Sequence, residues 1–289
     1  MTYSALTHTF SHKQAGNGFF TIALQFTRTC NYRCSHCSES SPLESLPTKQ
    51  VYKIIDNLAH AGIKRVNISG GEPTLREDWL DLIDYISQKK LYSSLATNCS
   101  TITPQTLQAL RGKISNLRVS IYGNERTHEA ITTVPGSFQR TRETAKKSQE
   151  IGIPTYACMT VMQDNLEQIA EVRNICREVG MEKLLLYSLV PKGRGSEIYP
   201  SQRVSKEQVQ TQISKIAPDT PEIYWSPFED DGICALIQAD GSLVATPYQG
   251  EPSRIKLVGW PLKESLTELW EKYPFKENYL AFNKEKMKC

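Results

Sequence analysis

The stretch FFTIALQFTRTCNYRCSHC, residues 19–37, joins two features that together indicate the fold. Residues 19–27 are rich in β-branched and aromatic side chains and predict a buried β-strand. Three cysteines, Cys30, Cys34 and Cys37, follow in the loop directly after that strand. Active sites of open α/β sheets lie at the carboxyl ends of their strands. The stretch therefore predicts an α/β protein with a cysteine-containing site at one edge of its sheet.

Strand-like and helix-like patterns alternate from this stretch to about residue 190. Further strands are expected at 64–69, 91–97, 116–122, 154–161 and 183–190. Helices are expected at 51–58 and 79–86, where apolar residues recur at helical spacing, and near 104–111, 137–150 and 165–178. Strand–helix units in tandem imply a parallel sheet with right-handed crossovers. The predicted core is a partial (β/α)6 barrel of the TIM-like kind.

The pattern changes after about residue 191. Residues 234–247 form two short apolar runs around Asp240 and Gly241, which predicts a β-hairpin. Helices are expected over 205–216 and 261–273. We therefore divide the chain into an N-terminal segment (1–17), a barrel core (18–195) and a small α+β C-terminal extension (196–289).

The cysteine spacing limits the kind of metal site that the loop can form. A structural zinc needs a fourth nearby ligand, and His36 is the one local candidate, although its backbone is already committed to the turn. A ferredoxin-type cluster needs four cysteines. Three protein ligands leave one iron of a 4Fe–4S cluster open, and an open position is typical of a catalytic site.

The motif Cys30-x3-Cys34-x2-Cys37, with SGGEP (69–73) at the end of the next strand, resembles the signature of the radical S-adenosylmethionine (SAM) enzymes. The resemblance implies one 4Fe–4S cluster held by these three cysteines, with SAM bound at the open iron. It also implies that the reduced cluster cleaves SAM to methionine and a 5′-deoxyadenosyl radical, which abstracts a hydrogen atom from the substrate.

The same resemblance implies a set of SAM-binding residues. Gly70, Gly71, Glu72 and Pro73 would hold the methionine amino group, and the backbone of His36 would read the adenine edge. The other members of the set are Thr97, Asn98, Ser120, Asn165 and Arg194.

Several of these residues have a structural alternative. GGEP is also a glycine-rich turn that can cap the next helix, and Asn165 is a candidate helix N-cap. Arg194 is alternatively a surface charge, and His36 alternatively faces solvent. Cys158 and Cys176 are expected in the core, whereas Cys99 has a possible role near substrate.

The C-terminal region resembles the SPASM or twitch region of the same superfamily, with Cys234 at the position of its first cluster cysteine and Cys289 at a later one. Two thiols cannot complete a 4Fe–4S cluster, so the extension is either a cluster-free version of this region or a truncated one. We predict no auxiliary cluster in this chain. Cys234 is either a small apolar residue or, as a sharper hypothesis, a hydrogen-atom donor.

The tail and residues 136–154 most resemble enzymes that modify ribosomally made peptides or build peptide-derived cofactors. One alternative is a radical SAM enzyme acting on a sugar or nucleotide, including epimerisation. Another is an iron–sulfur electron-transfer or structural module without turnover. Expected partners are SAM, a peptide or small-molecule substrate, and an electron donor such as flavodoxin or ferredoxin.

Composition places the protein among ordinary globular chains, with 39% hydrophobic and 22% charged residues. A net charge of +3 gives no support for nucleic acid or an anionic membrane as a partner. The N-terminal residues 1–14 show no basic leader followed by an apolar core. We therefore expect a cytoplasmic protein.

Overall fold

The computed structural model describes residues 21–39, 41, 43–219, 221–226, 233–247 and 255–273. The strands are β1 (Thr21–Thr27), β2 (Arg65–Gly70), β3 (Tyr92–Thr97), β4 (Asn116–Ser120), β5 (Thr155–Val161), β6 (Lys183–Ser188), β7 (Glu222–Ser226), β8 (Ile233–Ile237), β9 (Leu243–Pro247) and β10 (Lys256–Gly259). The predicted N-terminal segment, 1–17, lies outside the described residues.

Helices follow most of the parallel strands. They are α1 (Thr48–His60), α2 (Trp79–Gln88), α3 (Pro104–Leu110), α4 (Glu125–Thr132), α5 (Ser137–Ile151), α6 (Ile169–Glu178), α7 (Gly195–Gln202), α8 (Lys206–Ser214) and α9 (Leu266–Lys272), with 3-10 turns η1 (Pro73–Leu75) and η2 (Leu166–Gln168). No helix in the described ranges is long and apolar enough to cross a membrane.

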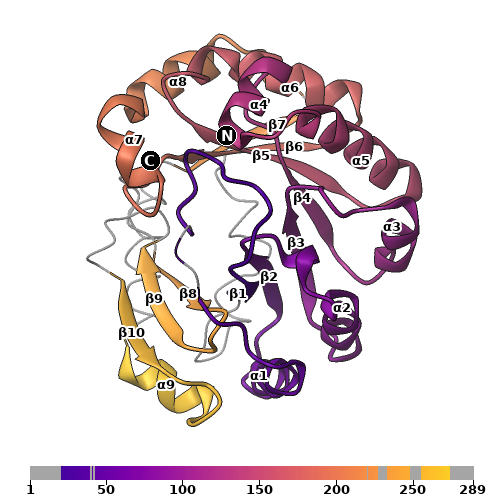
Figure 1. Ribbon diagram of the computed structural model, residues 1–289, viewed down its shortest axis with the longest axis vertical. Coiled ribbons are helices and arrows are strands. Elements are labelled where there is room, and N and C mark those ends of the chain that lie inside the picture. The colour runs from indigo at the N-terminus through magenta and orange to yellow at the C-terminus, as the bar shows by residue number, and fades with distance from the viewer. Residues whose placement is uncertain are drawn as a thin grey trace.

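The described strands form one sheet in the order β10-β9-β8-β1-β2-β3-β4-β5-β6-β7. Strands β1 to β7 are parallel and neighbour one another in sequence order. Figure 1 shows this sheet curving inside a row of helices, with α1, α2, α3 and α5 on the outside of the curve. The predicted α/β fold, a partial parallel barrel, is confirmed.

The sheet is larger than the six predicted strands because the C-terminal region joins both of its edges. β7 pairs parallel with β6, and β8 pairs parallel with β1. The expected hairpin is confirmed, since β8 and β9 are antiparallel neighbours. β7 has the sequence EIYWS, which is too short to show a clear strand period. The domain boundary near residue 195 stays a prediction, because the sheet continues across it.

Helix α4 was also not predicted. It has only eight residues, and its buried side chains are His128, Ile131 and Thr132, so it lacks an apolar stripe. The sequence feature that does indicate this helix is its N-cap residue, Asn124. The Asn124 side chain accepts a hydrogen bond from the Thr127 amide at 3.0 Å.

Side chains alternate between the two faces of the central strands. In β2, Val66 and Ile68 are buried in the core shared with the helices, whereas Ser69 lines an internal cavity on the opposite face. β4 repeats the pattern, with Val119 in the core and Ser120 at the cavity. Parallel strands buried on both faces are usually apolar throughout. The polar inner face therefore marks the inside of the barrel as a binding space.

The core between sheet and helices should dominate stability. Leu82 of α2 is fully buried, while Leu257 of β10 has 62% of its surface exposed. We expect Leu82→Ala to lower the free energy of unfolding by about 2–5 kcal/mol, and the same change at Leu257 by no more than about 0.5 kcal/mol. Urea unfolding measures both; similar losses at the two positions would contradict this packing.

Candidate active site

The barrel opens into a cavity of about 360 Å³ at the carboxyl ends of β1 to β6. Its lining includes ten residues predicted from the sequence: Cys30, Cys34, Cys37, His36, Gly70, Gly71, Glu72, Thr97, Asn98 and Ser120. Segments that lie far apart in the chain thus meet at one site, as the positions of these residues after their strands predict.

One backbone hydrogen bond and one arginine side chain hold the loop that carries the three cysteines. The Ser35 amide donates to the Ile131 carbonyl at 3.0 Å, which joins the loop to α4. The Arg194 guanidinium Nε donates to the Cys34 carbonyl at 2.9 Å. Arg194 is therefore a partly buried support of this loop and not a free surface charge, although it does not line the cavity itself.

The three thiols are close enough to affect one another. Burial raises the pKa of Cys34 to about 12, and the neighbouring Cys30 and Cys37 raise it further while Arg194 opposes them. Three thiolates at one site therefore require a positively charged group that compensates for them. Within the described ranges no His, Cys, Asp or Glu group is arranged to hold a single metal ion. Three thiols that line one cavity fit a cluster, in which different irons take different thiolates.

The cavity also fits a polar organic ligand. Two buried polar atoms on its wall, the Tyr32 hydroxyl and His36 Nδ1, have no hydrogen-bond partner among the described residues. Buried polar atoms normally find partners, in protein or in a ligand. Burial also lowers the pKa of His36 to about 4. Its ring packs edge-on against Tyr122 at 4.5 Å between centroids, so the alternative of a solvent-facing His36 is wrong.

Gly70 and Gly71 bring the end of β2 against the backbone that leads to Cys30. The Gly71 amide donates to the Thr27 carbonyl at 2.8 Å, and the Glu72 amide donates to the Thr29 carbonyl at 2.8 Å. A Cβ atom on Gly70 would overlap the Thr27 carbonyl, and one on Gly71 would overlap the Thr29 carbonyl. The two glycines are thus required by the fold of the cysteine loop as well as lining the cavity.

Glu72 is a buried carboxylate with a full set of donors. Its Oε1 accepts from the Thr74 hydroxyl at 2.6 Å and the Thr97 hydroxyl at 2.8 Å, and its Oε2 accepts from the Asn98 amide at 2.6 Å. Burial raises its pKa, while these bonds lower it. Glu72 also caps η1, which begins at Pro73. The turn-capping alternative for GGEP is therefore correct, and it coexists with a place on the cavity wall. Pro73 itself does not line the cavity.

Asn98 extends from the same network towards the cysteine loop. Its Nδ2 donates to Asn31 Oδ1 at 3.1 Å and makes a longer contact with Cys30 Sγ at 3.8 Å. The next residue, Cys99, points the other way, because it is fully buried in the core between sheet and helices. A role for Cys99 near substrate is therefore wrong.

Asn165 supports the cavity without reaching it. The side chain is fully buried; its Oδ1 accepts from the Met162 amide at 2.7 Å, and its Nδ2 donates to the carbonyls of Tyr122 (2.9 Å) and Thr160 (3.0 Å). Asn165 is the N-cap residue of η2, as the structural alternative held, but its side chain makes no capping bond there. Asn165 is not among the residues that line the cavity, and its contact with SAM stays a prediction. It instead holds the backbone of two wall residues, Tyr122 and Thr160.

Several cavity residues were not predicted from the sequence. They are Tyr32, Ser38, Glu39, Ser69, Ala96, Tyr122, Thr160, Tyr187, Ser188 and Val190. Ser69, Ala96 and Thr160 lie in β2, β3 and β5. Side chains alternate between the two faces of a strand, and this alternation places these three on the cavity face. Tyr32 and Glu39 lie in the cysteine loop, which is not a strand. The alternation of side chains along a strand therefore gives no indication of where they point.

The other cysteines lie in separate environments. Cys176 is fully buried in the core, as expected. Cys158 instead pairs in register with Ser120 and shares its inward face, and burial raises the pKa of its thiol to about 11. The backbone of Cys234 belongs to β8, but its side chain and the whole of Cys289 lie outside the described residues. The hydrogen-donor role of Cys234 stays a prediction.

A parallel barrel with three cysteines and a glycine-rich turn around one cavity defines a class of metal-cluster enzymes. The model of the radical SAM superfamily matches residues 24–176, and the chain belongs to this superfamily. A curated relative, the AdoMet-dependent heme synthase of Methanosarcina barkeri (strain Fusaro / DSM 804), is 34% identical over 61% of this chain and 52% of its own length. The mycofactocin maturase MftC of Mycolicibacterium smegmatis is 30% identical over 65% of this chain and 49% of its own.

A solved structure of anSMEcpe with bound AdoMet and the Kp18Cys peptide has a TM-score of 0.71, with 14% identity. The match covers 90% of this chain and 83% of that one. At this identity the likeness concerns the fold alone. The chain spans about half the length of the curated relatives it matches.

The contact at Gly70 gives a direct test of the site. Gly70 and Gly112 both have positive φ, +146° and +75°, but only at Gly70 would a Cβ meet other atoms. We expect Gly112→Ala to cost about 1–2 kcal/mol of unfolding free energy from backbone strain. Gly70→Ala should cost about 1–3 kcal/mol more, because of overpacking. Equal losses in urea unfolding would contradict the close approach of Gly70 to Thr27.

Proposed function

We propose that this chain binds one 4Fe–4S cluster and SAM, cleaves SAM reductively and abstracts a hydrogen atom from a peptide substrate. The observation that carries the proposal is the single cavity that the thiols of Cys30, Cys34 and Cys37 share with Glu72 and Asn98. A module that only carries electrons has no need of this additional polar wall. The enclosed binding space therefore favours turnover over electron transfer alone.

Each part of the wall has a separate task in this proposal. The three cysteines hold the cluster, which supplies the electron that cleaves SAM. Glu72 presents a carboxylate that is held in place by Thr74, Thr97 and the Asn98 amide. A fixed carboxylate suits the positively charged amino group of SAM. Gly71 and His36 also line the cavity, and the backbone of His36 would read the adenine edge.

The size of the cavity supports a substrate that reaches in from outside. About 360 Å³ lies within the range of a single small-molecule site, and SAM occupies such a site. A peptide can present one side chain at the mouth while the rest of it stays outside. Among the relatives, the PqqA peptide cyclase is named for a peptide. A flavodoxin or ferredoxin as electron donor remains part of the proposal.

The activity is tested by anaerobic reconstitution with iron and sulfide, followed by assay of 5′-deoxyadenosine from SAM and dithionite. We expect about four irons per chain and steady SAM cleavage. Cys37→Ala should lose both, because one iron loses its ligand. Cys176→Ala is the matched control, since Cys176 lies in the core and away from the cavity. It should keep its iron and its activity.

Two results would refute the activity. One is a wild-type protein that holds its cluster, receives adequate reductant and does not cleave SAM. The other is Cys37→Ala with full turnover. An iron content of about eight per chain would leave the activity intact but would contradict the prediction of a single cluster.

The substrate class is tested by adding two probes to the reconstituted enzyme. One is the small-peptide fraction of the producing organism, and the other is iron coproporphyrin III, the compound in the name of one relative. We expect the peptide fraction to raise 5′-deoxyadenosine formation several-fold and a peptide to change mass. Stimulation by iron coproporphyrin III alone would contradict a peptide substrate.

A further inference from the structure

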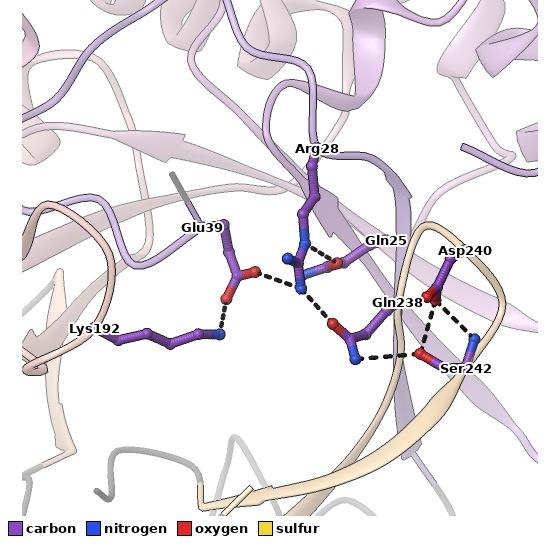
Figure 2. Close-up of polar contacts among 7 residues, drawn as sticks. All are labelled: Gln25, Arg28, Glu39, Lys192, Gln238, Asp240 and Ser242. Carbon is purple, nitrogen blue, oxygen red and sulfur yellow. Dashed lines mark hydrogen bonds and ion pairs between the residues drawn. The ribbon is translucent and has the colours of Figure 1, made fainter. Parts of the chain in front are cut away.

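The two ends of the cysteine loop are joined by an ion pair. Arg28 comes two residues before Cys30, and Glu39 comes two residues after Cys37. Arg28 Nη2 lies 3.1 Å from Glu39 Oε2 (Figure 2). Their side chains are only 11% and 15% exposed, so the pair is less screened by water than a surface pair. The Arg28–Glu39 ion pair therefore joins the two ends of the cysteine loop, which we call its base.

A second cation reaches the same carboxylate from another part of the barrel. Lys192 Nζ contacts Glu39 Oε1, and Lys192 belongs to the segment that follows β6 (Figure 2). The same segment carries Arg194, which donates to the Cys34 carbonyl. The segment after β6 thus holds the cysteine loop both at its middle and at its base.

The C-terminal hairpin holds the other partner of the ion pair. The Arg28 guanidinium donates through Nη2 to Gln238 Oε1 and through Nε to Gln25 Oε1, the latter at 3.2 Å. Gln238 follows β8, and its own Nε2 donates to the Ser242 hydroxyl at 3.2 Å. Figure 2 shows that Ser242 is in turn held by Asp240, across the hairpin turn.

A backbone contact docks the same turn beside the loop. The Leu46 amide donates to the Ala239 carbonyl at 2.9 Å. Ala239 is the residue directly after Gln238, so this bond ties the backbone next to Gln238 to the segment that follows the cysteines. Its amide is also fixed at both ends, by Arg28 and by Ser242. A planar guanidinium with acceptors on several sides has one permitted orientation, which lysine could not reproduce.

We propose that Gln238, Arg28, Glu39 and Lys192 are positioning residues that keep the base of the cysteine loop closed around its cluster. The C-terminal extension acts through Gln238 on a loop whose Arg28 lies 210 residues away in sequence. The inference rests on the proposed function, because it requires that the three cysteines hold a cluster. It goes beyond that function because Gln238 lies outside residues 24–176 and does not line the cavity.

The test compares cluster retention in three variants of the full chain. Gln238→Leu removes the acceptor for Arg28 with little change of size, and Gln238→Glu restores an acceptor. Gln149→Leu is the matched control, because Gln149 donates to the Gly180 carbonyl at 2.7 Å, away from the cavity. Each reconstituted protein is mixed anaerobically with an iron chelator, and the loss of cluster absorbance is followed alongside the melting temperature.

We expect Gln238→Leu to lose its cluster about tenfold faster than wild type, the scale of a lost hydrogen bond to a charged group. Gln238→Glu and Gln149→Leu should lose it at the wild-type rate. The electron paramagnetic resonance spectrum of the reduced cluster should broaden in Gln238→Leu alone, because a loop with an open base holds its thiolates in more than one arrangement.

Three outcomes would overturn the inference. The first is a wild-type rate of cluster loss in Gln238→Leu. The second is loss from Gln238→Glu as fast as from Gln238→Leu, since an acceptor would then not matter. The third is equally fast loss from Gln149→Leu, which would indicate general destabilisation. A wild-type protein that takes up no cluster would instead refute the proposed function and this inference with it.

Discussion

The site depends on a close backbone contact between the ends of two neighbouring strands. Gly70 and Gly71 allow the end of β2 to lie against residues 27–29, and two amide-to-carbonyl bonds of 2.8 Å hold it there. The cysteine loop starts from this fixed point and Glu72 follows it, so one contact sets the position of both. Any larger residue at Gly70 or Gly71 would push this backbone contact apart and displace the thiols relative to Glu72.

Charge is the second constraint on this site. Burial raises the pKa values of both Cys34 and Glu72, so each anion needs compensation. The hydrogen bonds from Thr74, Thr97 and the Asn98 amide stabilise the carboxylate from within the protein. For the thiol of Cys34, the Arg194 guanidinium opposes the rise in pKa that burial and the neighbouring thiols cause. This asymmetry fits a site in which the protein itself holds the carboxylate in place and the thiols serve a metal cluster.

The sequence predicted what depends on local pattern. The strand period placed β1 to β6. The resemblance to the radical SAM family identified the cysteines, Gly70, Gly71, Glu72, Asn98 and Ser120, which the structure brings to one cavity. The sequence could not show that Cys99 turns into the core, because the chain takes a positive φ at that residue and leaves the strand direction. Asn165, Arg28 and Gln238 act through contacts between distant segments, and no local pattern encodes their partners.

The central claim is that the cluster held by Cys30, Cys34 and Cys37 keeps one iron open and that SAM binds to it. Electron paramagnetic resonance of the dithionite-reduced protein, recorded with and without SAM, tests this claim most directly. The account predicts that SAM changes the g-values of the cluster signal in wild type. An intact reduced cluster whose spectrum is identical with and without SAM would contradict it.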